Sequence, residues 1–241
     1  MDALQAVRDE LRRLADPADA EFLQRYFKTG PGEYGERDRF LGIRVPALRR
    51  LVRAHDALTL DDCAELLRSA FHEERLLALL LLVRRYERGD ASVREAIYRT
   101  YLASTAHVDN WDLVDSSAAQ IVGAHLEDRD RSPLLRLATS ESIWERRIAI
   151  IATARFIKTD DFTWTLRIAR MLLGDRHDLI HKAVGWMLRE VGNRDRAVEQ
   201  AFLREHGPRM PRTMLRYAIE KFPPDLRREL MTGTITPPNA R

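Results

Sequence analysis

The chain has 241 residues, of which 45% are hydrophobic and 32% are charged, and its formal net charge is +3. That length is sufficient for one large domain or a run of repeats with a substantial core. The small net charge does not by itself indicate nucleic-acid binding, so the positions of the charges matter more than their sum. The single cysteine, Cys63, excludes an internal disulfide and a cysteine-rich zinc site, and is typical of a reducing compartment.

The sequence contains no segment with the composition of a membrane span or a secretory signal. The longest apolar run, residues 76–83, is far shorter than the roughly 20 residues that a transmembrane helix needs. The first residues include Asp2, Asp9 and Glu10 and have no apolar core. We therefore expect a cytoplasmic protein that does not bind membranes.

Helix start and stop signals occur along the whole chain, and no segment shows the sustained apolar–polar alternation that predicts strands. Asp16 precedes Pro17 as an N-cap before a proline, and Thr59 with Asp62 forms a capping-box pattern. The sequence therefore predicts an all-α protein. The predicted helices are 17–27, 46–52, 60–67, 73–87, 91–101, one from 109 or 110 to near 123, a short one from 133, one from 140 or 142 to 157, 163–174, 178–192, 195–204, 211–221 and 224–230.

A repeat underlies these helices. Four of them align on a polar residue that is followed by an apolar stripe, with successive spacings of 40, 32 and 35 residues. Helix pairs repeating at this length are typical of HEAT-type solenoids, whose equivalent helices line a concave face. We predict a single HEAT-like domain of antiparallel helix pairs over residues 1–231 with a loose tail at 232–241. The four polar residues would form a row on a concave, basic face, or alternatively make salt bridges between repeats. They are Arg75, Asp115, Arg147 and Lys182.

Two tryptophans accompany charged residues at helical spacing. Trp111 lies four residues before Asp115, so a helix places both on one side. Trp186 lies between Lys182 and Arg189 in an i, i+4, i+7 stripe. Indole faces beside cations suit a ligand that has apolar sugar edges and anionic phosphates. Core packing is the alternative for any single tryptophan.

Two further patterns carry less weight. His177 and His181 have the spacing of a helical metal-binding pair, but the sequence supplies no third ligand, and we expect neither a metal nor a cofactor. Residues 30–35 spell G-x-G-x-x-G, yet they follow a predicted helix and not a strand, so a dinucleotide site is not expected. We interpret this segment as a loop between two helices.

Several ordered motifs together resemble the AlkD-like family of DNA alkylation repair glycosylases, a HEAT-like all-helical group. The likeness extends over about residues 20–220. The resemblance implies an enzyme that excises cationic alkylpurines, such as 3-methyladenine and 7-methylguanine, from duplex DNA without a deep base-flipping pocket. The motifs that carry it are Arg25-Tyr26-Phe27-Lys28, Phe40-Leu41-Gly42-Ile43 with Pro46, Trp111 to Ser116, Ile143 to Arg147, and Lys182 to Glu190. Separately, we expect a monomer, because no patch in the sequence argues otherwise.

The resemblance also implies roles for individual residues. Asp115 corresponds to the catalytic aspartate, Trp111 and Trp186 to the indoles beside the lesion's deoxyribose, and Arg147 to an arginine that contacts phosphate. The segment from Gly30 to Arg37 is longer than the compact connection of well-known members, which leaves the substrate range open. The other residues expected to contact DNA are Tyr26, Arg49, Lys182 and Arg189.

Three functions remain open from the sequence. The first is a monofunctional alkylpurine DNA glycosylase in base excision repair. The second is a non-catalytic HEAT-like protein that binds distorted or branched DNA, in which Asp115 would have no chemical role. The third is a HEAT-type scaffold for protein partners. We favour the first, because a carboxylate among cations is useful where a sugar becomes positively charged.

Overall fold

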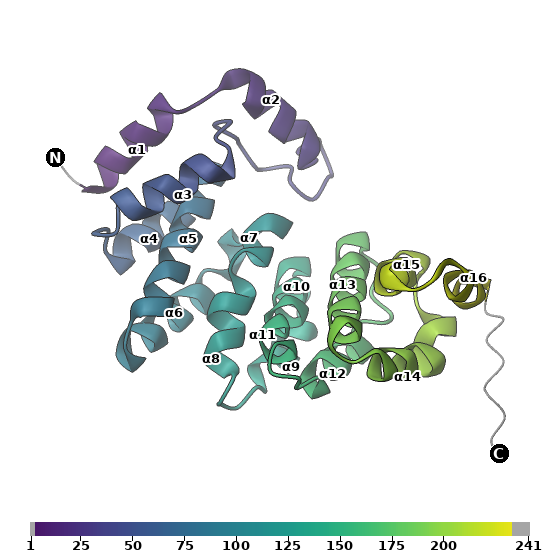
Figure 1. The fold of residues 1–241 in the computed structure, drawn as a ribbon. Coiled ribbons are helices and arrows are strands. Elements are labelled where there is room, and N and C mark those ends of the chain that lie inside the picture. The colour runs from purple at the N-terminus through teal and green to yellow at the C-terminus, as the bar shows by residue number, and fades with distance from the viewer. Residues whose placement is uncertain (1–2, 233–241) are drawn as a thin grey trace, which may run out of the picture. The chain divides into compact units, whose positions relative to one another are not determined.

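The computed structural model describes residues 3–232, and every regular element in that part of the chain is a helix (Figure 1). Its one strand-like feature is an isolated bridge between Arg39 and Phe71. The all-helical prediction is confirmed. The predicted tail begins on Thr232, the last residue of the final helix, and otherwise lies outside the described residues. No described helix is both long and apolar enough to cross a membrane.

The chain divides into two compact units, Met1–Ile121 and Val122–Arg241. The division falls inside a π-helix, Ala119–Gly123. A single continuous repeat domain, and the HEAT-like register within it, stay predictions.

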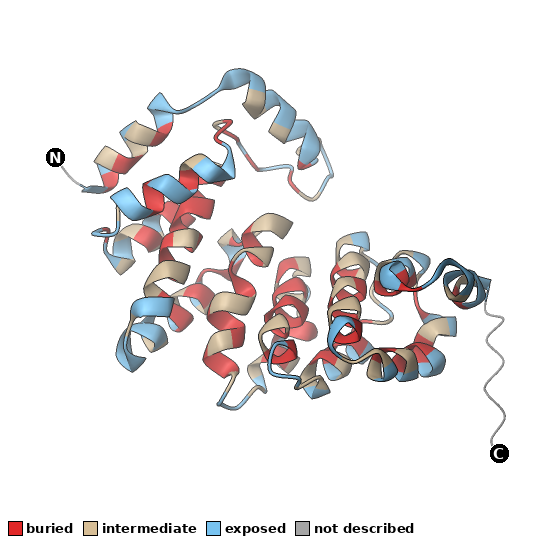
Figure 2. Cartoon of the chain, in the orientation of Figure 1, coloured by how far each residue is buried: buried red, intermediate tan, exposed pale blue. Residues whose placement is uncertain are grey.

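The first unit is built around helix α5, His72–Arg88, against which α3, α4, α6 and α7 pack. Most of α5 is buried, including all of residues 72–79 (Figure 2). The apolar run at residues 76–83 covers all sides of the helix and so needs partners on several sides, which the unit supplies. The other elements of this unit are α1 Ala3–Arg13, α2 Pro17–Tyr26, α3 Val45–Ala54, α4 Leu60–Leu67, α6 Ala91–Ala103, a 3₁₀ turn at Thr105–His107, and α7 Trp111–Asp115.

The second unit is built around helix α13, Asp178–Arg194, which packs against α10, α14 and α15. Gly185 permits the close approach of α15, because a Cβ at this position would lie 2.4 Å from the Met214 carbonyl oxygen. The other helices are α8 Ala124–Leu126, α9 Pro133–Ala138, α10 Ile143–Ala152, α11 Ala154–Ile157, α12 Thr163–Met171, α14 Arg196–His206, α15 Arg212–Ala218 and α16 Pro224–Thr232, with 3₁₀ turns at Gly207–Arg209 and Ile219–Lys221.

Helix starts predicted from capping residues are confirmed. The Asp16 carboxylate accepts hydrogen bonds from the first backbone N–H groups of α2. Thr59 and Asp62 form a complete capping box at the start of α4, and the Ser142 hydroxyl caps α10. These side chains satisfy N–H groups that have no partner inside their own helix.

For the helix predicted from residue 109 or 110 to near 123, the start is confirmed by the N-cap Asn110, but the predicted end is wrong, because α7 ends at Asp115. The hydroxyls of Ser116 and Ser117 both donate to the Leu113 carbonyl, at 3.2 and 2.6 Å. Serine side chains that bond to nearby carbonyls compete with the helical ladder. The chain then makes a turn and continues as the π-helix.

Other boundaries also differ from the prediction. Helix α13 does not stop at Gly192 but continues to Arg194. A Cβ at Gly192 would lie 1.7 Å from a carboxylate oxygen of Glu199, so this glycine permits a close contact and does not end the helix. The predicted helix to residue 157 is interrupted at Thr153, whose hydroxyl donates to the Ile150 carbonyl at 2.7 Å. Helix α1 was not predicted.

Candidate active site

The candidate catalytic pair lies on α7, a helix of five residues. Its N-cap is Asn110, whose side-chain oxygen accepts a hydrogen bond from the Trp111 N–H at 2.8 Å. Leu113 and Val114 are buried, whereas Trp111 and Asp115 are partly exposed. The helix therefore anchors itself through two apolar residues and presents the indole and the carboxylate, one turn apart, on its accessible side.

Trp111 belongs to an aromatic cluster that reaches the surface at Tyr26. The Trp111 ring stacks on Phe27, with a centroid distance of 5.2 Å and an interplanar angle of 26°. The Tyr26 ring meets the same indole edge-on at 6.0 Å. Phe27 is buried and Tyr26 is 55% exposed. Two residues that the sequence assigned to DNA contact, Tyr26 and Trp111, are thus in direct contact.

The turn after Asp115 is held from the interior. The Ser117 hydroxyl, which donates to Leu113, lies 3.0 Å from the hydroxyl of the fully buried Tyr101. Burial raises the pKa of Tyr101, and the nearby Asp115 carboxylate adds to that effect while the Ser117 hydrogen bond opposes it. Asp115 therefore sits close to a tyrosine that stays neutral, at the end of a helix with a fixed exit.

Arg49 lies on the exposed face of α3, opposite the buried Leu48 and Leu51. Arg50 and Arg53 are exposed on the same helix. Within residues 3–232, none of these three arginines forms a salt bridge, so their charges are available to an external anion.

The remaining predicted site residues belong to the second unit. Arg147 is only 5% exposed, and its Nη1 donates to the Leu179 carbonyl oxygen at 2.5 Å. Lys182 pairs with Asp178 at 2.7 Å, an exposed i, i+4 ion pair on α13. Little of the Arg147 side chain is accessible to a phosphate. Lys182 is accessible, and a phosphate could replace the Asp178 carboxylate as its partner because exposed ion pairs are weak.

Trp186 and Arg189 also lie on α13, and both contact glutamates. The Trp186 Nε1 donates to a carboxylate oxygen of Glu190 at 3.0 Å, and the side chain is partly exposed. Arg189 pairs with Glu220 and lies 3.8 Å from Glu190. A phosphate at Arg189 would have to replace Glu220 as its partner.

The first aligned cation, Arg75, does not line a surface. It is 4% exposed and donates to the Asp38 carboxylate at 2.8 Å, with Asp109 at 3.2 Å. Arg75 therefore forms buried ion pairs and is not part of an exposed basic row, so its expected place on such a face is wrong. Asp38 also accepts from Asn110 at 2.9 Å and lies 2.8 Å from His72. Neither Asp38 nor His72 is part of a local motif, so the sequence alone gives no signal that they belong near the site.

The two weaker motifs have structural roles. The His177 ring caps α13 by accepting from the Leu179 N–H at 3.2 Å, and His181 donates to the Asp175 carbonyl at 2.6 Å. Among the described residues, no group of three or more His, Cys, Asp or Glu side chains could hold a metal ion. Residues 30–35 form a loop after α2, in which the Glu33 carboxylate accepts from the Gly30 N–H at 3.1 Å.

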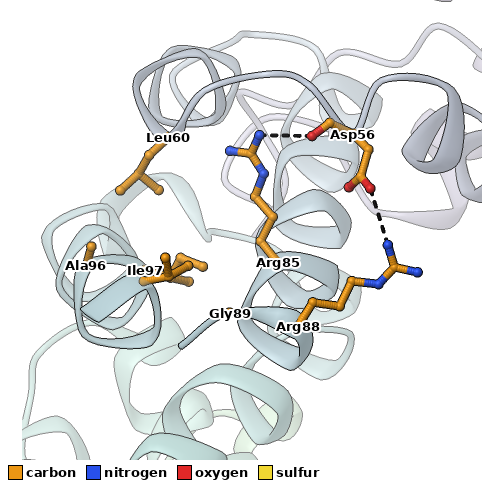
Figure 3. A pocket seen from close by; sticks show the side chains of 8 residues that line it. Asp56, Leu60, Arg85, Arg88, Gly89, Ala96 and Ile97 are labelled. Atoms are coloured by element: carbon orange, nitrogen blue, oxygen red, sulfur yellow. Dashed lines mark hydrogen bonds and ion pairs between the residues drawn. The ribbon is translucent and has the colours of Figure 1, made fainter. Parts of the chain in front are cut away.

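A pocket of about 460 Å³ in the first unit lies at the other end of α5 from His72, between α4, α5 and α6 (Figure 3). Its apolar wall includes Leu60 and Ile97, and Arg85 and Arg88 converge on Asp56 at its rim. None of the predicted site residues lines this pocket.

Comparison with known proteins agrees with this fold. Residues 7–222 match the family model described as DNA alkylation repair enzyme. A predicted DNA alkylation repair enzyme from Enterococcus faecalis has a similar structure, with a TM-score of 0.66 and 15% identity, over 87% of this chain and 97% of that one. No curated protein gives a significant match. The family match covers most of the sequence, and the chain therefore belongs to the DNA alkylation repair enzyme family.

Proposed function

We propose that this protein is a monofunctional DNA glycosylase that hydrolyses the N-glycosidic bond of cationic alkylpurines in duplex DNA. The observation that carries this proposal is the pairing on α7 of a partly exposed carboxylate, Asp115, with a partly exposed indole, Trp111, one turn away. Membership of a DNA alkylation repair family supports DNA as the substrate.

The chemistry suits a single carboxylate. Alkylation at N3 or N7 gives the purine a positive charge, so the base leaves as a neutral molecule and needs no general acid. The costly species is the oxocarbenium-like sugar. In this proposal the Asp115 carboxylate stabilises that developing charge and orients or deprotonates the attacking water.

The surrounding side chains supply binding. The Trp111 indole offers a π-face to the sugar, which attracts the developing cation and excludes water. Tyr26, which touches that indole, and the unpaired Arg49 would contact the DNA backbone from the first unit. Arg147, Lys182, Trp186 and Arg189 are proposed to contact DNA from the second unit. Because phosphate contacts release counterions, binding should weaken steeply as salt is added.

The test is an excision assay on methylated duplex DNA, scored by release of 7-methylguanine and by alkali-labile abasic sites. Asp115→Asn removes the negative charge while keeping the shape, so its excision rate should fall by about 100-fold or more. Its affinity for undamaged duplex should stay within about 2-fold of the wild type. Asp128→Asn is the matched control, because Asp128 is an exposed carboxylate of the second unit and should keep full activity.

The outcomes separate the three functions. Failure of the wild-type protein to release any of several cationic bases would rule out the glycosylase. Tight binding to branched or distorted DNA, unaffected by Asp115→Asn, would then favour the non-catalytic binding protein. Absence of duplex binding even at low salt would favour a scaffold for protein partners.

A further inference from the structure

A charged cluster with a buried centre bonds to Asn110 and Asp112, the chain neighbours of Trp111, and the proposed reaction does not use it. At its centre is His72, which is 2% exposed and begins α5. The His72 Nδ1 lies 2.8 Å from the Asp38 carboxylate, and its Nε2 lies 2.8 Å from the Asp112 carboxylate. An ionised carboxylate can only accept a hydrogen bond, so each ring nitrogen must carry a proton. The geometry therefore indicates an imidazolium between two carboxylates.

The two carboxylates also accept hydrogen bonds from other donors. Asp38 accepts from Arg75 at 2.8 Å and from Asn110 at 2.9 Å. Burial would raise the pKa of Asp38, but His72, Arg75 and Asn110 together lower it. The second oxygen of Asp112 accepts from the Leu113 N–H at 2.9 Å. Two of these contacts, His72 with Asp112 and Asn110 with Asp38, join α5 and the loop at Asp38 to the start of α7.

The ring of His72 also belongs to the aromatic cluster. It stacks on Phe40 at 4.6 Å and lies 5.0 Å from Phe27, whose ring is stacked on Trp111. A cation beside aromatic faces is attracted by their quadrupoles. His72 is consequently linked to Trp111 in two ways. One is through hydrogen bonds to Asp112 and, by way of Asp38, to Asn110, the chain neighbours of Trp111. The other is through the Phe27 ring, which contacts both His72 and the Trp111 indole.

We propose that His72 is the positioning residue of the candidate site, and that its doubly protonated ring fixes the start of α7 and so the placement of Trp111 and Asp115. The catalytic part of this inference rests on the glycosylase function proposed above. The structural part does not, because it concerns only the geometry of α7.

The arrangement makes the site sensitive to alkaline pH. Burial lowers the pKa of His72, but Asp112 and Asp38 outweigh it and raise the pKa to about 9. The other charged groups of the cluster are Arg75 on α5, which pairs with Asp38, and Asp109, which pairs with Arg75 before α7. When the ring loses a proton, one nitrogen turns a lone pair towards a carboxylate, and that contact becomes repulsive. The excision rate should therefore fall as pH rises through about 9.

The first test uses the wild-type protein and needs no activity. With ¹⁵N-labelled protein, both ring nitrogens of His72 should give protonated shifts at pH 7. The Trp111 indole N–H resonance, one of four from tryptophan, should move with the same midpoint as the His72 ring between pH 7 and pH 10. Two results would overturn the proposal. One is an unprotonated His72 ring nitrogen at pH 7, and the other is a Trp111 resonance whose chemical shift does not change as His72 titrates.

The second test compares His72→Gln with His55→Gln. Glutamine cannot span two carboxylates, so His72→Gln should shift the Trp111 indole resonance and leave that of Trp164, in the second unit, in place. Its single-turnover excision rate should fall by about 10- to 100-fold, since small misplacements of reacting groups have large effects on rate. DNA affinity should change less than about 2-fold, and the fall in excision rate near pH 9 should be absent from the variant's pH–rate profile. His55→Gln removes another histidine–carboxylate pair, with Glu10 at 2.7 Å, and should change none of these.

The two proposals fail in different ways. If the wild type releases no base but the resonances behave as described, the glycosylase is wrong and the positioning of α7 by His72 stands. If the wild type is active and a folded His72→Gln protein has the same rate, pH profile and Trp111 resonance, His72 has no positioning role. If His72→Gln does not fold, the wild-type titration alone decides.

Discussion

Glu199 offers a stability test that is independent of any ligand. This α14 residue is 1% exposed, and its Oε1 has no hydrogen-bond partner among residues 3–232. The nearest cation is Arg196, whose Nη1 lies 3.6 Å from Oε2. Burial raises the pKa of Glu199 to about 8, and the charges of Arg196 and Arg189 only partly offset it. At neutral pH the folded protein therefore keeps this carboxyl group protonated.

The sign of the effect follows from proton binding. The unfolded chain loses the Glu199 proton near the ordinary value of 4.5, whereas the folded chain keeps it until about pH 8. Between these values the unfolded state binds fewer protons, so stability falls as pH rises. At about 1.4 kcal/mol per pKa unit, the free energy of unfolding should lose about 4 kcal/mol from this group between pH 5 and pH 9.

The assay is urea unfolding of the wild type and Glu199→Gln, followed by far-UV circular dichroism at pH 5, 7 and 9. Glutamine keeps the shape of the side chain but cannot ionise. The free energy of unfolding of the variant, relative to that of the wild type, should therefore rise by several kcal/mol, up to about 4, from pH 5 to pH 9. The difference in unfolding free energy between variant and wild type removes the contributions of all other titrating groups, since these are common to both proteins. Glu229→Gln changes an exposed glutamate and should follow the wild type at every pH. A difference between Glu199→Gln and wild type that is the same at pH 5 and pH 9 would refute the reasoning.

Two substitutions test the packing and capping described above. Gly185→Ala places a Cβ 2.4 Å from the Met214 carbonyl oxygen and should destabilise the second unit by about 1–3 kcal/mol. Urea unfolding measures this loss, and an unchanged unfolding midpoint would contradict the close approach of the two helices. Asp62→Ala removes half of the α4 capping box and should lower the free energy of unfolding by about 1 kcal/mol. The control Asp61→Ala changes the exposed neighbouring residue and should lower it by less than about 0.5 kcal/mol. Equal losses would show that the cap contributes nothing.

The sequence predicts helix starts better than helix ends, for a physical reason. An N-cap such as Asp16 or Ser142 bonds to residues two or three positions away, so its signal is local. The ends depend on tertiary contacts. Gly192 resembles a stop signal, but its lack of a side chain makes room for Glu199 from the next helix. No pattern within α13 reveals that contact.

The same distinction applies to the candidate site. The pairing of Trp111 with Asp115 is predictable, because both lie on one turn of helix. The contact of Trp111 with Tyr26 is not predictable from spacing, and the resemblance to a family was needed to bring the two together. His72 lies 40 residues from Asp112 and 34 from Asp38, so the chain carries no periodic signal of their association.

Helix α7 has too few residues to be stable alone, and this bears on how the site works. Isolated helices shorter than about 12 residues are marginal in water, and α7 has five residues. Its conformation therefore depends on tertiary contacts, which include the burial of Leu113 and Val114 and hydrogen bonds near its two ends. At the start, Asp112 is held by His72, and at the exit Ser117 is held by the Leu113 carbonyl and Tyr101.

This arrangement separates the proposed reacting groups from several of the groups that place them. Trp111 and Asp115 remain partly exposed, as the proposed contact with DNA requires, while His72, Ser117 and Tyr101 supply hydrogen bonds around the two ends of the helix. The fixing contacts are buried on the other side, where water does not compete for them. A charged cluster in the core adds little to stability on average. Its position explains it, because it lies where the short helix that carries the proposed site needs an external constraint.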